Sequence, residues 1–485
     1  MDILMVTPEV IPFSRAGGLA DVSCHLALSL AARGHHVRII TPRYRQVLSA
    51  GQEITPLPIA TDIHLSVNTR KAVYSTAKIE LGTEVVFVGC DALFDREHVY
   101  GSEFGDYEDN AERYIFFSRA VMEYLRLAGL APNVIHCHDW PTGLVPAYLK
   151  TTYRNVEPLA KTATLFTFHN LGAQGIFSHY DYHQTGLGWE FFTPKNLEFH
   201  GKMNLAKSGL VFADVVSTVS RKYAREVLTP EYGFGLEGVL RERAQDTYSV
   251  LNGVNYRVWD PSRDTDLVAA YSPADLGPKA RCREDLAGAF NLARDGAPIV
   301  AVVSRLVDRK GIALILEAMS RLLALNLKFV FLGTGEDKYH VRLTDLARAY
   351  PDQIGLKLSY EHALAHRIVA GADMFLIPSR YEPCGLEQLY SMKYGTVPVV
   401  RATGGLDDTV IDHAQDPARS TGFKFEPYTA DALCEAMGRA VGVFQDKEAW
   451  TGLMLRGMSQ DFSWSRVAVE YEKLYGLALG KIGGN

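Results

Sequence analysis

Residues 17–22 of this chain read GGLADV, and residues 404–410 read the near copy GGLDDTV. Each Gly pair follows a short apolar run and precedes a segment with helical character. A Gly pair at a strand-to-helix turn lets a ligand approach the backbone because no Cβ stands in the way. The N-terminus of the following helix offers free N–H groups to an anion. Two such loops predict two doubly wound α/β halves that face one cleft and bind a phosphorylated small molecule.

A βαβ unit surrounds the first loop. Residues 3–6 read as a buried strand, residues 21–32 as a helix that Gly34 ends, and residues 37–40 as the next strand. Residues 73–79 and 84–88 predict a hairpin around Gly82 and Thr83. Further parallel strands of this half are expected at residues 134–135, 164–168 and 215–218.

A stretch rich in Pro, Gly and Asp runs from residue 252 to 277, and we place the hinge just before it, near 243–250. Strands and helices alternate again beyond it, which predicts a second parallel sheet whose ligands bind at the carboxyl ends of the strands. A C-terminal helix, 465–480, carries an aromatic stripe that is expected to pack against the first domain. The predicted domains are residues 1–245 with 465–485, and residues 246–464. The strands and helix expected in the second half are 299–303, 314–325 (helix), 329–332, 374–377 and 397–400.

Size, charge and cysteine usage narrow the class of protein. A chain of 485 residues is too long for one ordinary core, and its 47% hydrophobic and 22% charged residues fit a globular protein. The net charge of −6 argues against nucleic acid as a partner. Six scattered Cys without a C-x-x-C pair predict a reducing cytoplasm and neither a zinc nor a disulfide framework. The sequence has no signal peptide pattern and no apolar run of about 18 residues, so we expect no membrane span.

The strongest candidate motif is SRYEPCGL at residues 379–386, directly after a predicted strand. A carboxylate placed between a strand and a Gly turn is well placed to hold a ligand. Glu382 is therefore a candidate catalytic residue. The alternative is that Glu382 only caps the following helix.

A second motif, SRLVDRKG at residues 304–311, also follows a strand. Arg305 and Lys310 suit a leaving diphosphate, Arg as a bidentate fork and Lys as a point charge. The alternative is a solvated basic loop.

Two His segments form the third candidate, HCHDW at residues 136–140 and FHN at residues 168–170. A His here is either a catalytic group or a satisfied interior side chain. His136, Cys137 and His138 do not suit a common metal site, because adjacent strand residues point to opposite faces. A fourth candidate is Arg15 before Gly17 and Gly18, where a cation suits phosphate; a purely structural turn is the alternative.

Taken together, these segments resemble bacterial glycogen synthase and plant starch synthase, a family of retaining glycosyltransferases with the two-domain GT-B architecture. The resemblance extends over nearly the whole chain. It rests on motifs in a fixed order: PEVIP at 8–12, GGLADV at 17–22, HDW at 138–140, HNL at 169–171, QG at 174–175, LNGV at 251–254, SRL at 304–306, KG at 310–311, residues 378–386 and TGGL at 403–406.

The resemblance implies transfer of glucose from ADP-glucose to the non-reducing 4-hydroxyl of an α-1,4-glucan, either glycogen or a malto-oligosaccharide, with retention. It implies no further cofactor and no metal. Implied catalytic residues are His169, Arg305, Lys310, Glu382 and Asp139. Implied donor-binding residues are Arg15, Gly17, Gly18, Asn252, Tyr360, Cys384, Gly385, Leu386, Thr403, Gly404, Gly405 and Leu406.

Two departures from the family pattern bear on this expectation. Arg15 stands where the family usually has Lys, which keeps the charge but changes its reach and leaves open whether ADP-glucose or UDP-glucose is preferred. Tyr390 stands where the wider superfamily often has a second Glu. The competing hypotheses are a GT-B transferase with another donor or acceptor, and a glucan-binding protein without catalytic activity.

Overall fold

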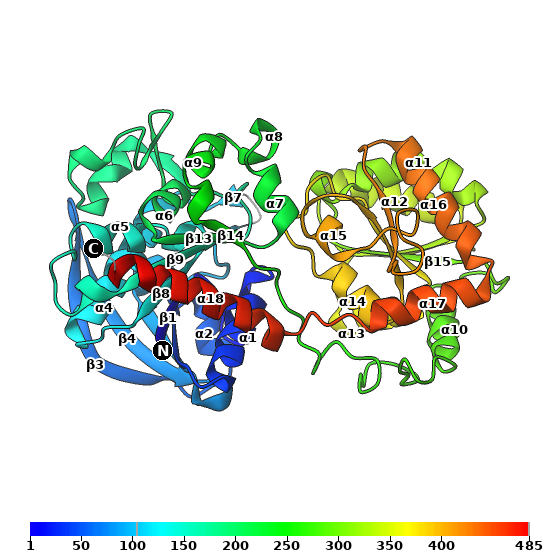
Figure 1. The fold of residues 1–485 in the computed structure, drawn as a ribbon, viewed down its shortest axis with the longest axis horizontal. Helices are drawn as coiled ribbons and strands as arrows, with labels where there is room; N and C mark the ends of the chain where they lie inside the picture. Colours follow the sequence, from blue (N-terminus) through cyan, green and yellow to red (C-terminus); the bar gives the residue numbers. More distant parts are fainter. Residues whose placement is uncertain (103–104, 484–485) are drawn as a thin grey trace. The chain divides into compact units, whose positions relative to one another are not determined.

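The computed structural model describes residues 1–102 and 105–483. The chain forms two units, one of Met1–Gly253 with Trp464–Asn485 and one of Val254–Ser463 (Figure 1). The sequence placed the boundary near 243–250. In the structure, Thr247–Ser249 forms the edge strand β14, which pairs in parallel with β13 (Val215–Thr218), so the division falls after Gly253.

The described part of the first unit is built on a nine-stranded sheet of order β14-β13-β9-β8-β1-β2-β5-β4-β3. Strands β14 to β5 are parallel, while β4 and β3 continue the sheet as antiparallel strands. The predicted hairpin is confirmed as the antiparallel pair of β4 and β5. The strand bounds are β1 Asp2–Val6, β2 His36–Pro42, β3 Thr55–Leu65, β4 Asn68–Lys78, β5 Glu84–Gly89, β8 Val134–His138 and β9 Ala163–Phe168. Short strands lie outside this sheet: β6 Gly101–Ser102, β7 Gly105–Asp106, β10 Ile176–Ser178, β11 Glu198–Phe199 and β12 Lys202–Asn204.

Helices cover both faces of this sheet, so its central strands are buried on both sides. In β1, Leu4 and Val6 join one core, and Ile3 and Met5 join the other, as expected for a parallel strand. The helices are α1 Leu19–Ala32, α2 Arg45–Ser49, α3 Asp91–Phe94, α4 Asn110–Leu127, α5 Leu144–Lys150, α6 Leu205–Phe212, α7 Arg221–Glu226, α8 Pro230–Gly233, α9 Glu237–Glu242 and α18 Trp464–Gly483.

The C-terminal helix α18 packs on α1 and β9 of the first unit (Figure 1). Five members of the aromatic and apolar stripe are buried in the core there: Trp464, Val467, Tyr471, Leu474 and Tyr475. The sixth member, Leu477, is exposed. The expected packing is therefore confirmed for all of the stripe except Leu477.

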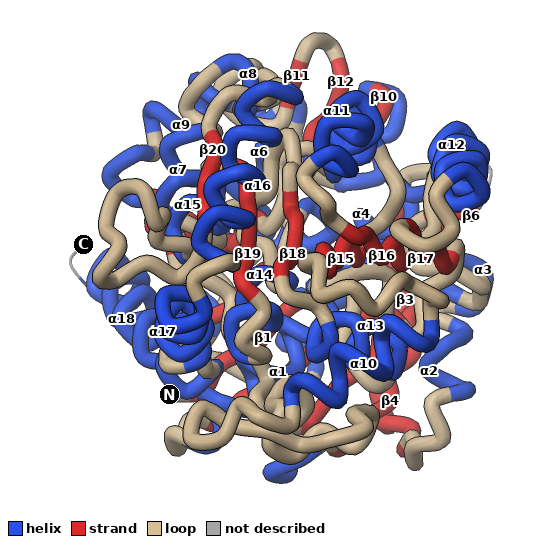
Figure 2. Tube along the Cα trace, turned by 90° about the vertical axis from the view of Figure 1, so that its right-hand side faces the viewer, coloured by secondary structure: helices blue, strands red, loops and turns tan. Residues whose placement is uncertain are grey.

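The second unit contains a six-stranded parallel sheet among its described residues, of order β17-β16-β15-β18-β19-β20. Figure 2 shows the six strands side by side in this order. The strands are β15 Ile299–Val303, β16 Lys328–Leu332, β17 Ile354–Lys357, β18 Met374–Ile377, β19 Val397–Arg401 and β20 Phe423–Phe425. The helices are α10 Lys279–Ala289, α11 Ile312–Ala324, α12 Asp337–Ala349, α13 His362–Gly371, α14 Glu387–Lys393, α15 Gly404–Thr409, α16 Ala430–Phe444 and α17 Lys447–Met458.

Each sheet reverses its strand order once. The chain runs β1, β2, β5 in one direction and β8, β9, β13 in the other, and likewise β15, β16, β17 and then β18, β19, β20. The reversals lie between β1 and β8 and between β15 and β18. In open α/β sheets, ligands bind at the carboxyl ends of the strands at such a reversal.

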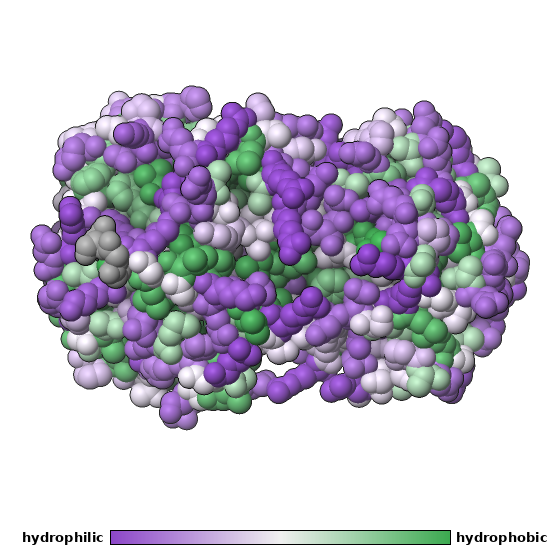
Figure 3. All heavy atoms as spheres, viewed as in Figure 1, coloured by the Kyte–Doolittle hydropathy of each residue, from purple (hydrophilic) through white to green (hydrophobic). Residues whose placement is uncertain are grey.

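Hydrophilic side chains are spread over the face shown in Figure 3, with smaller hydrophobic patches among them. None of the described helices combines the length and apolarity that a membrane crossing requires.

Candidate active site

The loops after β15 and β18 touch each other through their backbones. Gly311 adopts φ +78°, and a Cβ there would lie 2.2 Å from the carbonyl oxygen of Pro378. The N–H of Arg380 donates to the carbonyl of Arg309 at 2.8 Å. Glycine is therefore required at position 311, and the two loops are held together at the strand reversal of the second unit.

This contact brings Lys310 and Glu382 together. The Lys310 ammonium donates to the Glu382 carboxylate at 2.5 Å, and the Ser379 hydroxyl donates to the same oxygen at 3.0 Å. Both charged side chains are at least nine-tenths buried. Burial alone would raise the pKa of Glu382, but the Lys310 and Arg309 cations and these hydrogen bonds hold it below the usual value. Glu382 is therefore ionised, and it is not the cap of the next helix.

Arg305 differs from Lys310 in its surroundings. Its side chain is exposed, and no hydrogen bond or ion pair from the described residues engages its guanidinium. A guanidinium in this state is available to a bound anion. The alternative of a solvated basic loop thus fits the position of Arg305 but not that of the buried Lys310.

The loop after β19 packs against the Glu382 segment. A Cβ at Gly404 would lie 1.9 Å from the carbonyl oxygen of Glu382, and one at Gly405 would lie 2.0 Å from that of Cys384. The N–H of Gly405 also donates to the carbonyl of Glu382 at 3.2 Å. This Gly pair is thus required by contact between two protein backbones, which the sequence had attributed to ligand approach. Thr403 precedes α15 as its N-cap, and Leu406 lies in the core.

Cys384, Gly385 and Leu386 lead into α14. Gly385 adopts φ +70°, and the amide of Gln388 donates to the carbonyls of Cys384 and Gly385 at 3.1 Å. The carboxylate of Glu387 accepts the N–H of Leu386 at 3.1 Å.

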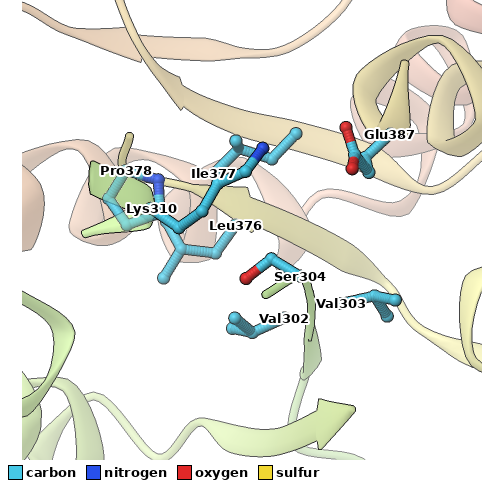
Figure 4. A pocket seen from close by; sticks show the side chains of 8 residues that line it. All are labelled: Val302, Val303, Ser304, Lys310, Leu376, Ile377, Pro378 and Glu387. Carbon is cyan, nitrogen blue, oxygen red and sulfur yellow. The ribbon is translucent and has the colours of Figure 1, made fainter. Parts of the chain in front are cut away.

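A cavity of about 10 Å³, room for roughly one water, lies beside the ends of β15 and β18. Figure 4 shows its lining: Val302, Val303, Ser304, Lys310, Leu376, Ile377, Pro378 and Glu387.

Tyr390 lies on α14, whereas Tyr360 lies in the segment between β17 and α13. Tyr360 follows β17, at the edge of the sheet, and is 57% exposed. The ring of Tyr390 stacks on Trp259, with centroids 3.9 Å apart and planes within 3°. Tyr390 therefore packs against Trp259 at the position where the superfamily often has Glu.

In the first unit, Asp139 follows β8 with a backbone conformation of φ 57° and ψ 175°. Glycine is usually the only residue found there, and the strain costs about 1–3 kcal/mol. The Asp139 carboxylate accepts the N–H of His169 at 2.6 Å. Burial raises the pKa of Asp139 to about 7, and the nearby Glu9 charge adds to this, although N–H groups of His169 and Asn170 act against it. The structure thus fixes Asp139 against the end of β9.

Three His rings form a row beside Asp139. His136 is fully buried and lies within hydrogen-bond distance of the hydroxyls of Tyr475 and Thr167, at 3.0 and 2.7 Å. Nδ1 of His138 lies 3.1 Å from Nε2 of His169. Burial lowers the pKa of His169 to about 3, so this ring is neutral at neutral pH. His136 is thus a satisfied interior residue, and only His169 is half-exposed.

The loop at residues 15–18 is exposed but has partners within the protein. The N–H groups of Ala16 and Gly17 donate to the Glu9 carboxylate at 2.5 and 2.9 Å. Arg15 pairs with Asp21 at 2.9 Å. Gly18 is the N-cap of α1, with φ −70°. A Cβ at Gly17 would lie 3.9 Å from its nearest neighbour, Oε1 of Glu9, which is an ordinary van der Waals contact. Packing therefore does not require glycine at position 17, in contrast to position 404.

Asn252 lies near the end of the first stretch of unit 1, three residues beyond β14. It is 7% exposed, and its buried side-chain oxygen has no hydrogen-bond partner among the described residues. A buried unpaired oxygen costs free energy unless a ligand or water satisfies it.

One group of possible metal ligands occurs among the described residues, formed by Asp264, Asp266 and His366. It contains none of the predicted site residues. The Asp264 carboxylate is already engaged by His366 at 2.6 Å and by the hydroxyl of Tyr394 at 2.5 Å, which fits a structural role in attaching the segment before α10.

Sequence reasoning gave no role to Glu9 or Ser379, which contact predicted site residues directly. Glu9 carries the same signal that singled out Glu382, a carboxylate just beyond a buried strand. Ser379 begins the quoted motif but lacks a distinctive spacing of its own.

The sequence of this chain is similar to those of known glycosyltransferases. Residues 2–242 match the family described as starch synthase catalytic domain, and residues 287–441 match glycosyl transferases group 1. A glycogen synthase of Anaeromyxobacter is 44% identical over 98% of this chain and 99% of its own length. One of Koribacter versatilis is 43% identical over 98% of both chains.

A solved structure extends the likeness to three dimensions. The catalytic domain of starch synthase IV from Arabidopsis thaliana, bound to ADP and acarbose, is 31% identical and matches with a TM-score of 0.89 over 99% of both chains. With two doubly wound α/β units and these full-length relatives, the chain belongs to the glycogen synthase and starch synthase family of GT-B glycosyltransferases.

Proposed function

We propose that this protein transfers glucose from ADP-glucose to the non-reducing 4-hydroxyl of an α-1,4-glucan and retains the α configuration. The buried Lys310–Glu382 ion pair beside the unengaged Arg305 carries the proposal. The relatives named glycogen synthase and the starch synthase that binds ADP and acarbose support this choice of donor and acceptor.

Charge development explains why these groups would be needed. As the anomeric bond breaks, negative charge grows on the leaving diphosphate, and preorganised cations stabilise it. Arg305 supplies a free bidentate fork and Lys310 a fixed point charge. Glu382 holds Lys310 in place and, through its own carboxylate, accepts hydroxyl groups of the transferred glucose.

Groups of the first unit complete the proposed reaction. His169 lies beside the reacting carbon as a neutral ring, and Asp139 and Asn252 position the glucose. The amide oxygen of Asn252 then gains the partner that it lacks among the described residues. The backbone at Gly18 and the segment 403–406 contact phosphate or sugar, and Tyr360 stacks on adenine.

Retention requires attack from the face that the diphosphate leaves, or a covalent intermediate on a carboxylate. We favour same-face attack, in which an oxygen of the departing phosphate takes the proton of the acceptor hydroxyl. The Glu382 carboxylate is tied to Lys310 and Ser379, and that of Asp139 to the N–H of His169, which makes both poor nucleophiles.

The decisive experiment measures ADP release from ADP-glucose with and without glycogen, alongside UDP-glucose. Glycogen-dependent ADP release, with new α-1,4 linkages seen by NMR, supports the proposal. Preference for UDP-glucose or a small acceptor would identify another transferase. Glycogen binding without nucleotide release would identify a glucan-binding protein.

A further inference from the structure

Glu9 is a buried carboxylate with no role in the proposed reaction. It lies three residues beyond the end of β1, at the strand reversal of the first unit, and is 3% exposed. One oxygen accepts the N–H groups of Ala16 and Gly17 at 2.5 and 2.9 Å. The other accepts the hydroxyl of Tyr100 at 3.2 Å. All of its described hydrogen bonds therefore serve to connect β1, the loop at 15–18 and Tyr100.

The loop at 15–18 has few other attachments. All four of its residues are exposed. The N–H of Arg15 donates to the side chain of Gln46 at 3.0 Å, and the Arg15–Asp21 ion pair is more than half exposed on the Arg side, where such a pair stabilises little. On the buried side, one carboxylate oxygen of Glu9 accepts the N–H groups of two adjacent residues of the loop. Glu9 is thus the main support of this loop from its buried side.

We propose that Glu9 is a positioning residue: it holds the loop at 15–18 from beneath, so that the exposed backbone of Gly17 and Gly18 is presented in one conformation to the donor phosphate. That the loop binds the donor phosphate rests on the proposed function. That Glu9 fixes the conformation of the loop does not depend on the proposed function. The acceptor oxygen of Glu9 performs this role. Its negative charge opposes a phosphate and is not needed.

Glu9→Ala removes both the acceptor oxygens and the charge of Glu9, whereas Glu9→Gln removes the charge and keeps an acceptor oxygen. Comparing the two variants therefore shows which of the two properties supports the loop. The amide oxygen of Gln can accept both N–H groups, and its NH₂ can donate to the Tyr100 hydroxyl, whereas Ala removes every bond. For Glu9→Ala we expect the KM for ADP-glucose to rise about tenfold, while the KM for glycogen and kcat change less than about threefold. Glu9→Gln restores the KM for ADP-glucose to within about threefold of the unmodified chain.

Amide hydrogen exchange of a peptide covering residues 10–20 supplies a second readout without substrate. Exchange at residues 16–17 accelerates in Glu9→Ala and returns to the original rate in Glu9→Gln. Tyr44→Phe is the matched control, because it removes a buried hydroxyl contact with Tyr114 in the same region, at 3.2 Å, without touching the loop. It leaves both the exchange at 16–17 and the donor KM unchanged.

Unchanged exchange and donor KM in Glu9→Ala would overturn the proposal, as would an equal rise of both KM values. Glu9→Gln behaving like Glu9→Ala would show that the charge matters and not the acceptor oxygen, which also overturns it. If the unmodified chain transfers no glucose, the proposed function fails, and the exchange rates alone still decide whether Glu9 holds the loop.

Discussion

The ammonium of Lys310 and the carboxylate of Glu382 lie 2.5 Å apart, joining the loops after two adjacent strands. Removing one member leaves an uncompensated buried charge, which typically costs about 3–5 kcal/mol. A change of Lys310 therefore affects the fold as well as the proposed site.

We therefore expect Lys310→Met to lower both activity and the free energy of unfolding, the latter by about 3–5 kcal/mol. The double variant Lys310→Met/Glu382→Gln should lose less stability than the two single changes added together. Denaturant unfolding of the four proteins measures the coupling. Strict additivity would contradict a direct interaction in solution.

Arg305→Ala should separate catalysis from folding. Its guanidinium is exposed and unengaged among the described residues, so we expect the melting temperature to stay within the range of ordinary surface changes. Loss of one donor to the developing charge should lower kcat about 10²–10³-fold. Arg348→Ala on the exposed face of α12 is the control and should keep full activity. Near-normal turnover of Arg305→Ala would remove Arg305 from the diphosphate site.

The two Gly pairs should respond differently to Ala. Gly404→Ala forces a Cβ to 1.9 Å from a backbone carbonyl, whereas the Cβ position at Gly17 is open. We expect Gly404→Ala to destabilise the protein by clearly more than the ~1 kcal/mol typical of a point change, and Gly17→Ala to leave the melting temperature nearly unchanged. Thermal unfolding of both variants tests this. Equal stability of the two would contradict the packing described at residues 382–384.

Asp139 should make stability depend on pH. Its pKa is raised from 3.8 to about 7 in the folded protein, so between these values the folded state binds more protons than the unfolded state. The contribution of Asp139 to stability is present below about pH 4 and is lost as the pH rises through about 7. Asp139→Asn cannot ionise, and its side chain is close in size to that of Asp.

We expect the melting temperature of Asp139→Asn to exceed that of the unmodified chain at pH 8, and this excess to shrink toward pH 4. The exposed Asp352→Asn is the control and should show no such trend. If the difference in melting temperature between Asp139→Asn and the unmodified chain stayed constant from pH 4 to 8, the pKa of Asp139 would not be raised in the folded state.

The central parallel strands, such as β1, β15 and β18, were predictable because each is a short apolar run that is buried on both faces. The parallel strands at the sheet edges, β14, β17 and β20, were not predicted, because they are short and only partly buried. The alternation of the central strands with helices predicted the doubly wound architecture, which the observed strand orders confirm. By contrast, β3 escaped prediction: it is an edge strand, largely exposed, with Pro56 and Pro58 in its first half, and such a strand lacks a hydrophobic run. The small sheet of β10, β11 and β12 was missed because its strands have only two or three residues.

The position of the motifs at the strand ends was predictable, because parallel strands bring their carboxyl ends to one edge of the sheet. The contacts that these motifs make with other parts of the protein were not predictable. Nothing in the spacing indicates that Glu9 takes the N–H groups of Ala16 and Gly17, that Gly404 faces a carbonyl instead of a ligand, or that Asp139 adopts positive φ. These depend on the approach of segments far apart in sequence. The catalytic and donor-binding roles of all the predicted site residues stay predictions.

The position of α18 has a consequence for biosynthesis. Its aromatic stripe fills a core that is otherwise built from the N-terminal half of the chain. A nascent chain emerging from the ribosome therefore exposes that apolar surface until the residues of α18 have been translated, whereas the whole of Val254–Ser463 is available earlier. Truncations that stop before Trp464 should consequently recruit chaperones or aggregate through the amino-terminal half.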